Sequence, residues 1–511
     1  MPLRLMALRY APLLALLVTA AVAAQPLPDT LRAPADADSI AVYGWTVDAD
    51  ADRLLVGARV WPPPYTPPPE EPRGAAERAD HHGTVFVYQL QPDGSWAIEG
   101  RLRADYISRE DCFGWAMDLR GDLAVIGAEC EYSQDENGAF LIGATYLYRY
   151  DGSEWVREAK LSIPNAPDEQ PHTYAFGESV AVGDGFVVVG AGSTRLPSNP
   201  DEDHSSGAAF IFEQVDGVWT RTATLRNDDA DVQVNEYFGG AVAVSGNSVL
   251  VGSPSNDAAG MDRSGAVYVF ERTGGEWTQT AKLTAPSPSP VTYFGALLAA
   301  DAEGAVVGSW RTVYPVERGG AGWEVESALV AAIRPNGVAR AGGYALTVDG
   351  DVTSEQGYDA YLFEREGVVW EETRLPTESY LASRDEMVSL TSTHAFIGSP
   401  EESSGEVLVY DLGLLTAGEP VPTDAAGLTL TVAPNPIRRN ASVRFTLPEA
   451  GSSRLVVYDV LGREVLRLVD AAVPAGSHEA RVDAGGLAAG SYLVRLDTDS
   501  GVETRLVTVV R

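Results

Sequence analysis

The sequence predicts an all-β protein in which a seven-bladed β-propeller is followed by a small, Ig-like β-sandwich. Two observations carry this prediction. The dipeptide Phe-Gly recurs at intervals of 63, 62 and 56 residues, each time followed by the same succession of short strands and turns, at Phe113, Phe176, Phe238 and Phe294. This period is about that of a four-stranded propeller blade with its loops. Residues 428–511 instead alternate in short apolar segments separated by glycine and proline turns, which is typical of a β-sandwich.

The copy that begins at Phe238 shows the pattern of one repeat. Residues 238–245 alternate small and β-branched side chains, and after a two-residue turn, residues 248–254 form an apolar run typical of a strand buried on both faces. Residues 265–272 and 277–284 predict a third and a fourth strand on either side of a glycine turn. Four antiparallel strands joined by turns make one propeller blade.

Counting outward from the clear copies gives seven. The first opens at Tyr43-Gly44, and copies five to seven are eroded but legible up to residue 412. The seventh lacks a fourth strand, whereas residues 30–34, which match the end of a fourth strand at 282–286, stand unpaired before copy one. We therefore expect the mature N-terminus to supply the outer strand of the last blade, so that no edge stays open between the first and last blades of the propeller at 25–412.

These repeats resemble the FG-GAP repeat family, the β-propeller repeats of integrin α-chains and of many bacterial secreted proteins. The resemblance covers roughly residues 30–412 and is strongest in copies two to four. Calcium-binding integrin repeats carry an Asp-x-Asp-x-Asp-Gly-type loop between their first two strands. Here that connection is a tight turn such as Gly121-Asp122, which cannot wrap six to eight oxygen ligands around calcium, so the integrin metal sites are not expected.

The C-terminal segment 428–511 resembles the type A sorting domain of type IX secretion in the order, spacing and terminal position of its motifs. By that resemblance the chain is carried across the outer membrane by the type IX machinery, the tail is usually removed, and the cargo is released or attached to the cell surface. An ordinary Ig-like module is the alternative, since β-sandwiches are common without shared motifs. The residues that carry the resemblance are Pro434, Asn435, Pro436, Tyr458, Asp459, Gly462, Gly490 and Tyr492.

The other end of the chain agrees with export. Residues 1–24 combine Arg4 and Arg9 with an apolar stretch and small residues at its end, which predicts a Sec signal peptide rather than a membrane span. No other segment has the ~18 consecutive apolar residues that a spanning helix needs. Residues 413–427 are expected to be a linker between the propeller and the sorting domain. We therefore expect an extracellular or cell-surface protein without a transmembrane segment.

The composition narrows the choice of partners. The formal net charge is −35, and lysine occurs only as Lys160 and Lys282. Nucleic-acid binding needs clustered positive charge and is therefore not expected. An acidic surface keeps a protein soluble and attracts cations. A hydrophobic fraction of 45% argues against wholesale disorder.

The two cysteines, Cys112 and Cys130, flank the first hairpin of the second repeat. In an exported protein such a pair is expected to form a disulfide. A simple hairpin register would place Cys112 opposite Glu131 instead of Cys130, so the bridge requires a bulge or another irregularity.

The sequence offers no recognised catalytic motif. None of the six histidines lies in a His-Glu-x-x-His or comparable context, and the histidines beside acidic residues at 80–82 and 201–204 are better interpreted as parts of solvated loops than as metal ligands. The tripeptide Arg120-Gly121-Asp122 falls in a tight turn that wants glycine and aspartate for its geometry. The repeated tryptophans occupy one position of the blade and are expected to be packing residues: Trp96, Trp155, Trp219, Trp277 and Trp370.

Loop lengths single out one face of the propeller. The connections between second and third strands, and between one repeat and the next, are long and emerge on the same face, whereas the others are minimal. Function is often hosted on loops held by a rigid scaffold, although these loops could equally be tolerated insertions. The candidate binding residues on this face are Asp201, Asp203, Asp228, Asp229, Tyr174, Tyr237 and Tyr293.

Two function classes remain. We expect a non-catalytic propeller that binds an unknown extracellular protein or glycan in adhesion. The alternative is a secreted polysaccharide hydrolase or lyase, which the fold alone does not exclude. A central pocket with two carboxylates whose pKa values are shifted in opposite directions would favour the enzyme. No cofactor is predicted, and a divalent cation held by the acidic loops is the one candidate.

Overall fold

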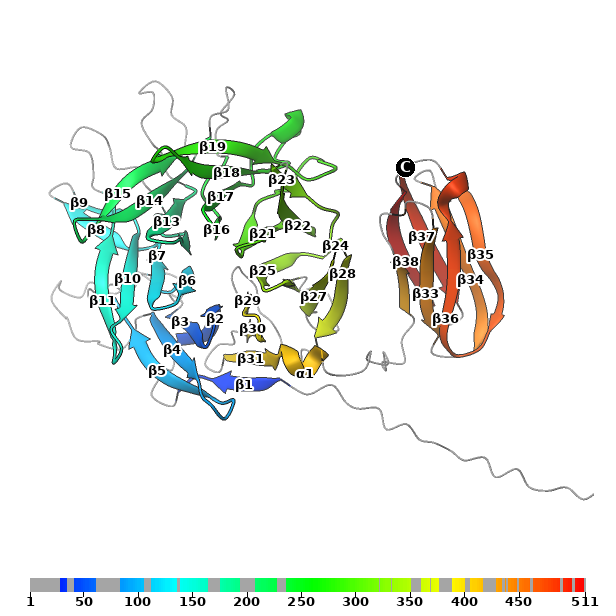
Figure 1. Cartoon of the computed structure of the whole chain (residues 1–511), viewed down its shortest axis with the longest axis horizontal. Helices are drawn as coiled ribbons and strands as arrows, with labels where there is room; N and C mark the ends of the chain where they lie inside the picture. Colours follow the sequence, from blue (N-terminus) through cyan, green and yellow to red (C-terminus); the bar gives the residue numbers. More distant parts are fainter. Residues whose placement is uncertain are drawn as a thin grey trace, which may run out of the picture. The chain divides into compact units, whose positions relative to one another are not determined.

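The computed structural model is all-β, with its strands grouped in small antiparallel sheets (Figure 1). Its contacts divide the chain into two compact units, residues 27–416 and 417–511, each considered by itself below. The structure describes residues 28–34, 41–60, 83–104, 112–135, 138–163, 175–193, 207–227, 236–320, 322–331, 333–350, 360–367, 369–375, 388–399, 405–416, 429–433, 437, 440–447, 450–459, 463–487, 490–498 and 501–509. The predicted signal peptide lies outside these residues.

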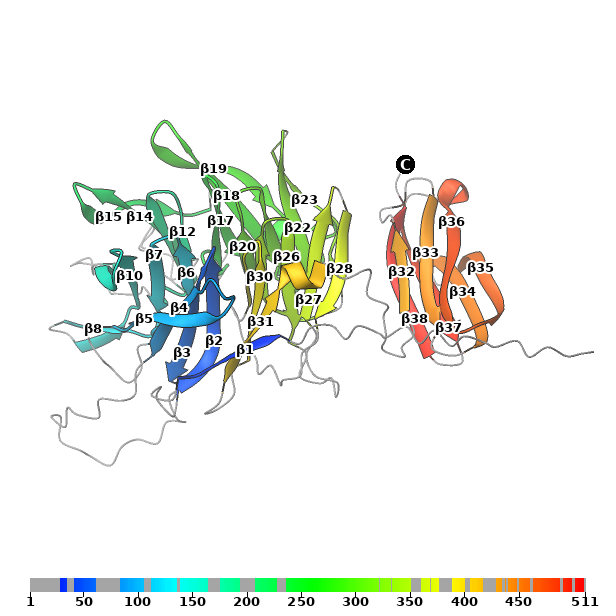
Figure 2. The ribbon, with the colours of Figure 1, turned by 60° about the horizontal axis from the view of Figure 1, so that its bottom comes forward.

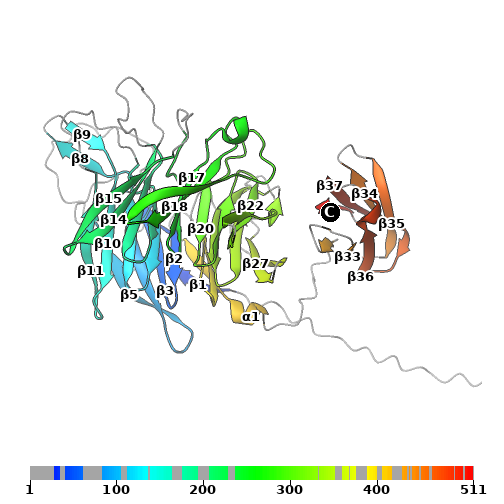
Figure 3. The same ribbon diagram turned by 45° about the horizontal axis from the view of Figure 1, so that its top comes forward.

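Four consecutive repeats each form a four-stranded antiparallel sheet whose strands pair in sequence order. The first is β2 (Ala41–Asp50), β3 (Arg53–Val60), β4 (Thr84–Leu90) and β5 (Trp96–Leu102). The second is β6 (Met117–Arg120), β7 (Leu123–Ala128), β10 (Ala144–Tyr150) and β11 (Trp155–Leu161), with a separate hairpin, β8 (Tyr132–Asp135) and β9 (Gly138–Leu141), seen at its margin in Figure 3. The third is β12 (Ser179–Val182), β13 (Phe186–Ala191), β14 (Ala208–Val215) and β15 (Val218–Leu225). The fourth is β16 (Val242–Ser245), β17 (Ser248–Ser253), β18 (Ala266–Thr273) and β19 (Glu276–Leu283), with the short η1 (Ala258–Gly260) between β17 and β18.

The later, eroded repeats form sheets of the same kind. One is β20 (Leu297–Ala300), β21 (Gly304–Gly308), β22 (Thr312–Gly319) and β23 (Gly322–Val325), with β24 (Val330–Ala331) also paired to β22. The next is β25 (Pro335–Ala341), β26 (Tyr344–Asp349), β27 (Ala360–Glu366) and β28 (Val369–Leu375). The last is β29 (Val388–Leu390), β30 (His394–Ser399) and β31 (Glu406–Asp411), which ends at α1 (Leu412–Thr416).

The outer strand of that last sheet comes from the beginning of the chain. β1 (Asp29–Arg32) pairs antiparallel with β31, from Asp29 opposite Val409 to Arg32 opposite Glu406. Figure 2 shows β1 lying along β31 beside the first repeat. The strand thus fills the place that a fourth strand fills in the other sheets, and the two ends of the repeat region are joined by main-chain hydrogen bonds.

The hydrophobic core lies between the sheets. Within residues 27–416, each cluster of buried side chains combines two sheets that follow one another around the ring of Figure 1, for example Val125 of β7 with Val189 of β13. Phe396 of the last sheet packs with Tyr43 and Val56 of the first in the same way. The second strands are buried along their whole length, as the apolar runs predicted. Burial of apolar area between sheets, about 25 cal/mol per Å², therefore holds neighbouring sheets face to face.

The Phe-Gly step is the joint between neighbouring sheets. Phe238 is 1% exposed, and the N–H of Gly239 donates to the Gly252 carbonyl of its own sheet at 2.9 Å. A Cβ atom on Gly239, whose φ is +91°, would lie 2.2 Å from the Ala208 carbonyl oxygen of the preceding sheet. In return, a Cβ on Gly190 of that sheet would meet the Gly239 oxygen at 2.1 Å. Glycine is therefore required on both sides of the joint, which explains why the dipeptide recurs.

Residues 429–509 form the second unit. One sheet has the order β32 (Thr429–Ala433), β33 (Asn440–Leu447) and β36 (Gly476–Asp483). The other has the order β35 (Glu464–Val473), β34 (Gly451–Asp459), β37 (Gly490–Thr498) and β38 (Gly501–Val509), and η2 (Ala484–Gly486) follows β36. Both sheets contribute to one core, in which Leu430 and Val443 meet Leu455 and Val494. Two antiparallel sheets around a shared core make a sandwich.

Candidate binding site

A cavity of about 580 Å³ lies where the first strands of several repeats begin and their second strands end. Its wall includes Glu178 and Ser179 at the start of β12, and Pro254 and Ser255 just after β17. Because the long connections also leave the sheets at these strand ends, the cavity belongs to the face that loop length singles out. Aromatic side chains dominate the wall: Trp45, Trp115, Tyr237, Tyr293 and Trp310.

The repeats contribute unequally to this wall. The residue directly after the Phe-Gly or Tyr-Gly step lines the cavity in five repeats, as Trp45, Trp115, Glu178, Gly240 and Ala296. The first three repeats thus place a large side chain at this position, and the next two place a small one. The wall therefore differs from one repeat to the next.

Hydrogen bonds hold the Tyr237 side chain in the wall of the cavity. Its phenol interacts with the Glu178 carboxylate and the Ser193 hydroxyl, and Glu178 also accepts the N–H of Gly192 at 3.0 Å. The ring lies close over Gly192 and Gly240, since a Cβ atom on either would come within 2.8 Å of it. Burial, followed by the negative charge of Glu178, raises the pKa of Tyr237 to about 12. The phenol therefore stays protonated and can donate a hydrogen bond at any physiological pH.

Tyr293 and Trp310 form a second aromatic group in the wall. Their rings stack with centroids 5.4 Å apart and an interplanar angle of 27°. The Arg263 guanidinium lies 5.8 Å from the centre of the Tyr293 ring, and that of Arg334 lies 5.8 Å from Trp310. Cations over aromatic faces are attracted by the ring quadrupole, so this pair already has two cationic neighbours. Trp310 nevertheless remains 46% exposed.

Of the residues proposed from the sequence for this face, Tyr237 and Tyr293 line the cavity. Both have a positive φ, 61° and 51°, and so do Cys112 and Ala175 at the same place before Phe-Gly. Because the strained conformation recurs in four repeats, it belongs to the joint between sheets and not to a site of its own. The other candidates lie outside the described residues: Tyr174, Asp201, Asp203, Asp228 and Asp229.

Two further carboxylates connect the innermost strands. Asp48 of β2 accepts the N–H of Leu119 at 2.7 Å and the hydroxyl of Ser389 at 3.2 Å, and Asp118 of β6 accepts the N–H of Val182 at 2.5 Å. Burial raises the pKa of Asp118 to about 7 and that of Asp48 well above its usual range. Both shifts go in the same direction, and neither residue lines the cavity. Each carboxylate ties one sheet to the next through a backbone N–H.

The structure brings the two cysteines together. Their Cα atoms are 5.3 Å apart, within the range of a disulfide. Beyond Met117 opposite Ile126, the Gly127 N–H donates to Ala116, and the N–H groups of both Gly114 and Trp115 donate to the Gly127 carbonyl at 3.0 and 3.2 Å. Two residues of one segment thus face one of the other, and this bulge shifts the register so that Cys112 meets Cys130.

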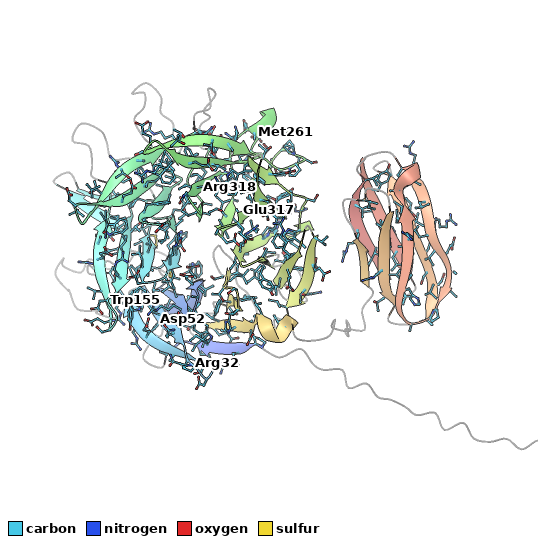
Figure 4. All side chains as sticks on the ribbon, in the orientation of Figure 1. Arg32, Asp52, Trp155, Met261, Glu317 and Arg318 are labelled. Carbon is cyan, nitrogen blue, oxygen red and sulfur yellow. A yellow bond between two sulfur atoms is a disulfide. The ribbon has the colours of Figure 1, made fainter. Side chains whose placement is uncertain are left out.

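The repeated tryptophans pack between neighbouring sheets near the outer edge, where Figure 4 labels Trp155. Where a repeat carries glutamate three residues after its tryptophan, the next tryptophan donates its indole N–H to that carboxylate, as in Trp155 to Glu99 at 2.8 Å and Trp219 to Glu158 at 3.0 Å. Where that position is threonine, at Thr222 and Thr280, the indole N–H of the following Trp277 or Trp323 has no hydrogen-bond partner among the described residues. These tryptophans are framework residues.

Metal-ligating side chains do not cluster in the part of the chain that the structure describes. Within it, no group of three or more His, Cys, Asp and Glu side chains could hold a metal ion. The described helices include none long and apolar enough to cross a membrane. The acidic loops proposed for a divalent cation lie mostly outside the described residues.

The sorting-domain motifs fall at strand ends of the second unit. Tyr458 and Asp459 end β34, and Asp459 pairs with Tyr492 of β37, which begins at Gly490. Tyr492 is 8% exposed and belongs to the shared core. Pro434, Asn435, Pro436 and Gly462 lie outside the described residues.

Comparison with known proteins supports both resemblances. Residues 219–270 match the family model of the FG-GAP repeat, and residues 431–510 match that of the secretion system C-terminal sorting domain of type IX secretion. No curated protein matches the chain. Among solved structures, one chain of the "Crystal Structure of Mitotic Checkpoint Complex" is similar at 11% identity and a TM-score of 0.46, over 80% of this chain and 100% of that one.

Proposed function

We propose that residues 25–412 form a seven-bladed β-propeller and that residues 428–511 form an Ig-like sandwich that sorts it. The four-stranded sheets, the cores between them and the pairing of β1 with β31 support a closed propeller. The FG-GAP repeat at 219–270 supports the same architecture.

The sorting domain indicates export across the outer membrane to the cell surface or the extracellular space. We propose that residues 1–24 first direct the chain through the Sec pathway and that the type IX machinery then recognises residues 428–511. In that oxidising setting a bridge between Cys112 and Cys130 is expected to persist. Intact-mass measurement of the exported protein with and without reductant tests the bridge, and two alkylatable thiols without reductant would disprove it.

The proposed activity is non-catalytic binding of an extracellular ligand in adhesion, at the face that holds the cavity. The observation that carries this proposal is the unequal lining: the Phe-Gly or Tyr-Gly step recurs in five repeats, whereas the residue after it is Trp, Trp, Glu, Gly and Ala in turn. Ligand sites are concave and lined by aromatic residues with a few polar groups. A cavity of about 580 Å³ with five aromatic side chains fits that description.

The alternative is a polysaccharide hydrolase or lyase, and the hydrolase would need a pair of carboxylates in the cavity. Among the described residues of its wall, Glu178 is the one carboxylate, and it is engaged by Gly192 and Tyr237. The described wall therefore supports binding better than hydrolysis.

The test is an array of matrix proteins and glycans probed with the purified mature chain, once with calcium and once with chelator. Selective binding that Trp115→Ala weakens supports the proposal, and loss of signal with chelator would assign a metal to the acidic loops. A silent array together with release of reducing sugar from a polysaccharide would replace it with the enzymatic alternative.

A further inference from the structure

The charges at the cavity restrict its ligand. Glu178 is the charged side chain among the described lining residues, and the whole chain carries a net charge of −35. An anionic ligand would therefore enter against the field of the protein. The cationic groups beside the aromatic pair of the wall, Arg263 and Arg334, already lie over Tyr293 and Trp310.

The same two arginines disfavour a cationic ligand. An ammonium or guanidinium group that used the Tyr293–Trp310 pair would have to displace Arg263 or Arg334, or stand beside it against like-charge repulsion. The Glu178 carboxylate is also partly satisfied by the Gly192 N–H and the Tyr237 phenol. The local arginines thus offset the attraction that the net charge of −35 exerts on cations, so the wall favours a ligand without net charge.

The wall of the cavity combines apolar rings with polar groups. Exposed aromatic rings such as Trp310, 46% exposed, and Tyr237, 38% exposed, alternate with hydroxyl and carboxylate groups such as Ser255 and Glu178. A purely apolar ligand would leave these polar groups without water or partners, which is costly. A sugar ring presents C–H groups on its face and hydroxyl groups on its edge, so it matches aromatic faces and polar groups at once.

We infer that the cavity binds a neutral oligosaccharide, with aromatic rings of the wall against sugar faces and Glu178 accepting sugar hydroxyl groups. The inference rests on the proposed function, since an exported binding protein meets glycans outside the cell. A volume of about 580 Å³ is suited to a short oligosaccharide. The unequal lining gives the saccharide a single orientation instead of several equivalent ones.

The experiment is calorimetric titration of the full chain with neutral tetrasaccharides of glucose, mannose, xylose and N-acetylglucosamine. A uronic-acid tetrasaccharide and an arginine-rich peptide serve as charged probes. The variant is Trp310→Ala, chosen because this side chain is half-exposed. The matched control is Trp323→Phe on β23, a tryptophan outside the cavity whose indole N–H has no hydrogen-bond partner to lose.

We expect one neutral tetrasaccharide to bind, with an affinity that changes little between low and high salt because no ion pair is formed. Trp310→Ala should weaken binding about tenfold or more, the order expected for removing one stacked aromatic group, and Trp323→Phe should leave it unchanged. Circular dichroism checks that both variants are folded.

Three results would overturn the inference: no neutral sugar binds, Trp310→Ala binds as well as the unaltered chain, or a charged probe binds more tightly with a steep salt dependence. If the matrix array still shows a selective protein ligand, the inference fails and the proposed function stands. If neither sugars nor the array give binding, both fail.

Discussion

The carboxylate of Glu99 is expected to contribute strongly to the stability of the first sheet, where it pairs with Arg53, and to its contact with the second sheet, through Trp155 of β11. It receives two hydrogen bonds from Arg53, at 2.9 and 3.0 Å, and one from the Trp155 indole at 2.8 Å, and the Arg53 and Glu99 side chains are only 17% and 14% exposed. Removing one partner of a buried ion pair costs about 3–5 kcal/mol. Because this pair keeps some exposure, and an unpaired indole N–H adds about 1 kcal/mol, we expect Glu99→Ala to cost about 3–4 kcal/mol.

Glu271 offers a matched control. It pairs with Arg318 of the following sheet at 2.7 Å, but the Arg318 and Glu271 side chains are 46% and 29% exposed (Figure 4 labels Arg318). Exposed pairs contribute about 0–1 kcal/mol. Glu99→Gln, which keeps a hydrogen-bond acceptor for Trp155, should fall between the two alanine variants.

The assay is thermal unfolding followed by circular dichroism. For the roughly 390 residues of the first unit, an unfolding entropy of about 2.1 cal/mol/K per residue converts 3–4 kcal/mol into a drop of about 4–5 °C, against at most about 1 °C for Glu271→Ala. Equal shifts for the two alanine variants would show that burial of the ion pair does not set its contribution.

The glycine joint and the buried carboxylates between the inner strands give two more predictions. Gly239→Ala and Gly217→Ala both place alanine at positive φ, but of the two only position 239 has a backbone oxygen within 4 Å of the new Cβ. We therefore expect urea unfolding to show a loss of about 1 kcal/mol in the free energy of unfolding for Gly217→Ala and of at least about 3 kcal/mol for Gly239→Ala. Similar losses would show that the close approach of the two sheets does not require glycine at position 239. Burial raises the pKa of Asp118 to about 7, beside Asp48, Asp50 and Arg120, so the folded chain takes up a proton there and its stability should fall as pH rises from about 4 to 7. Asp118→Asn keeps an acceptor for the Val182 N–H and should raise the unfolding midpoint at pH 8 while leaving it unchanged at pH 4; an equal effect at both pH values would contradict the assigned pKa.

The repeat pattern allowed much of the framework to be predicted, because its residues obey the same local requirement in every copy. A short apolar run between turns, such as 248–253, favours a strand between two others, and it forms β17. The unmatched segment near residue 30 lacks a partner in sequence, and it pairs with β31. Both inferences depend on counting strands and not on side-chain detail.

The cavity could not be predicted in the same way. Trp45, Trp115 and Glu178 are separated by more than 60 residues from one to the next, and they meet only because the sheets follow one another around a ring. Aligning the repeats on Phe-Gly and comparing the next residue would have singled them out. A simple hairpin count also misses the cysteine register, because Gly114 and Trp115 both donate to Gly127 and this bulge moves Cys112, whose φ is 51°, by one residue to face Cys130.

Positions that are the same in successive repeats and positions that differ between them therefore indicate different things: the first indicate the framework, and the second indicate a binding site. Positions that join one sheet to the next must satisfy the same geometry each time, so Phe113, Phe176, Phe238 and Phe294 are all at most 1% exposed and are each followed by glycine. The next position faces the cavity and meets no such requirement, so a purely structural ring would tolerate one residue type there throughout. Instead it changes from tryptophan to glutamate to glycine. A ligand without rotational symmetry needs different groups on different sides, and the order of these residues around the ring is what can supply them.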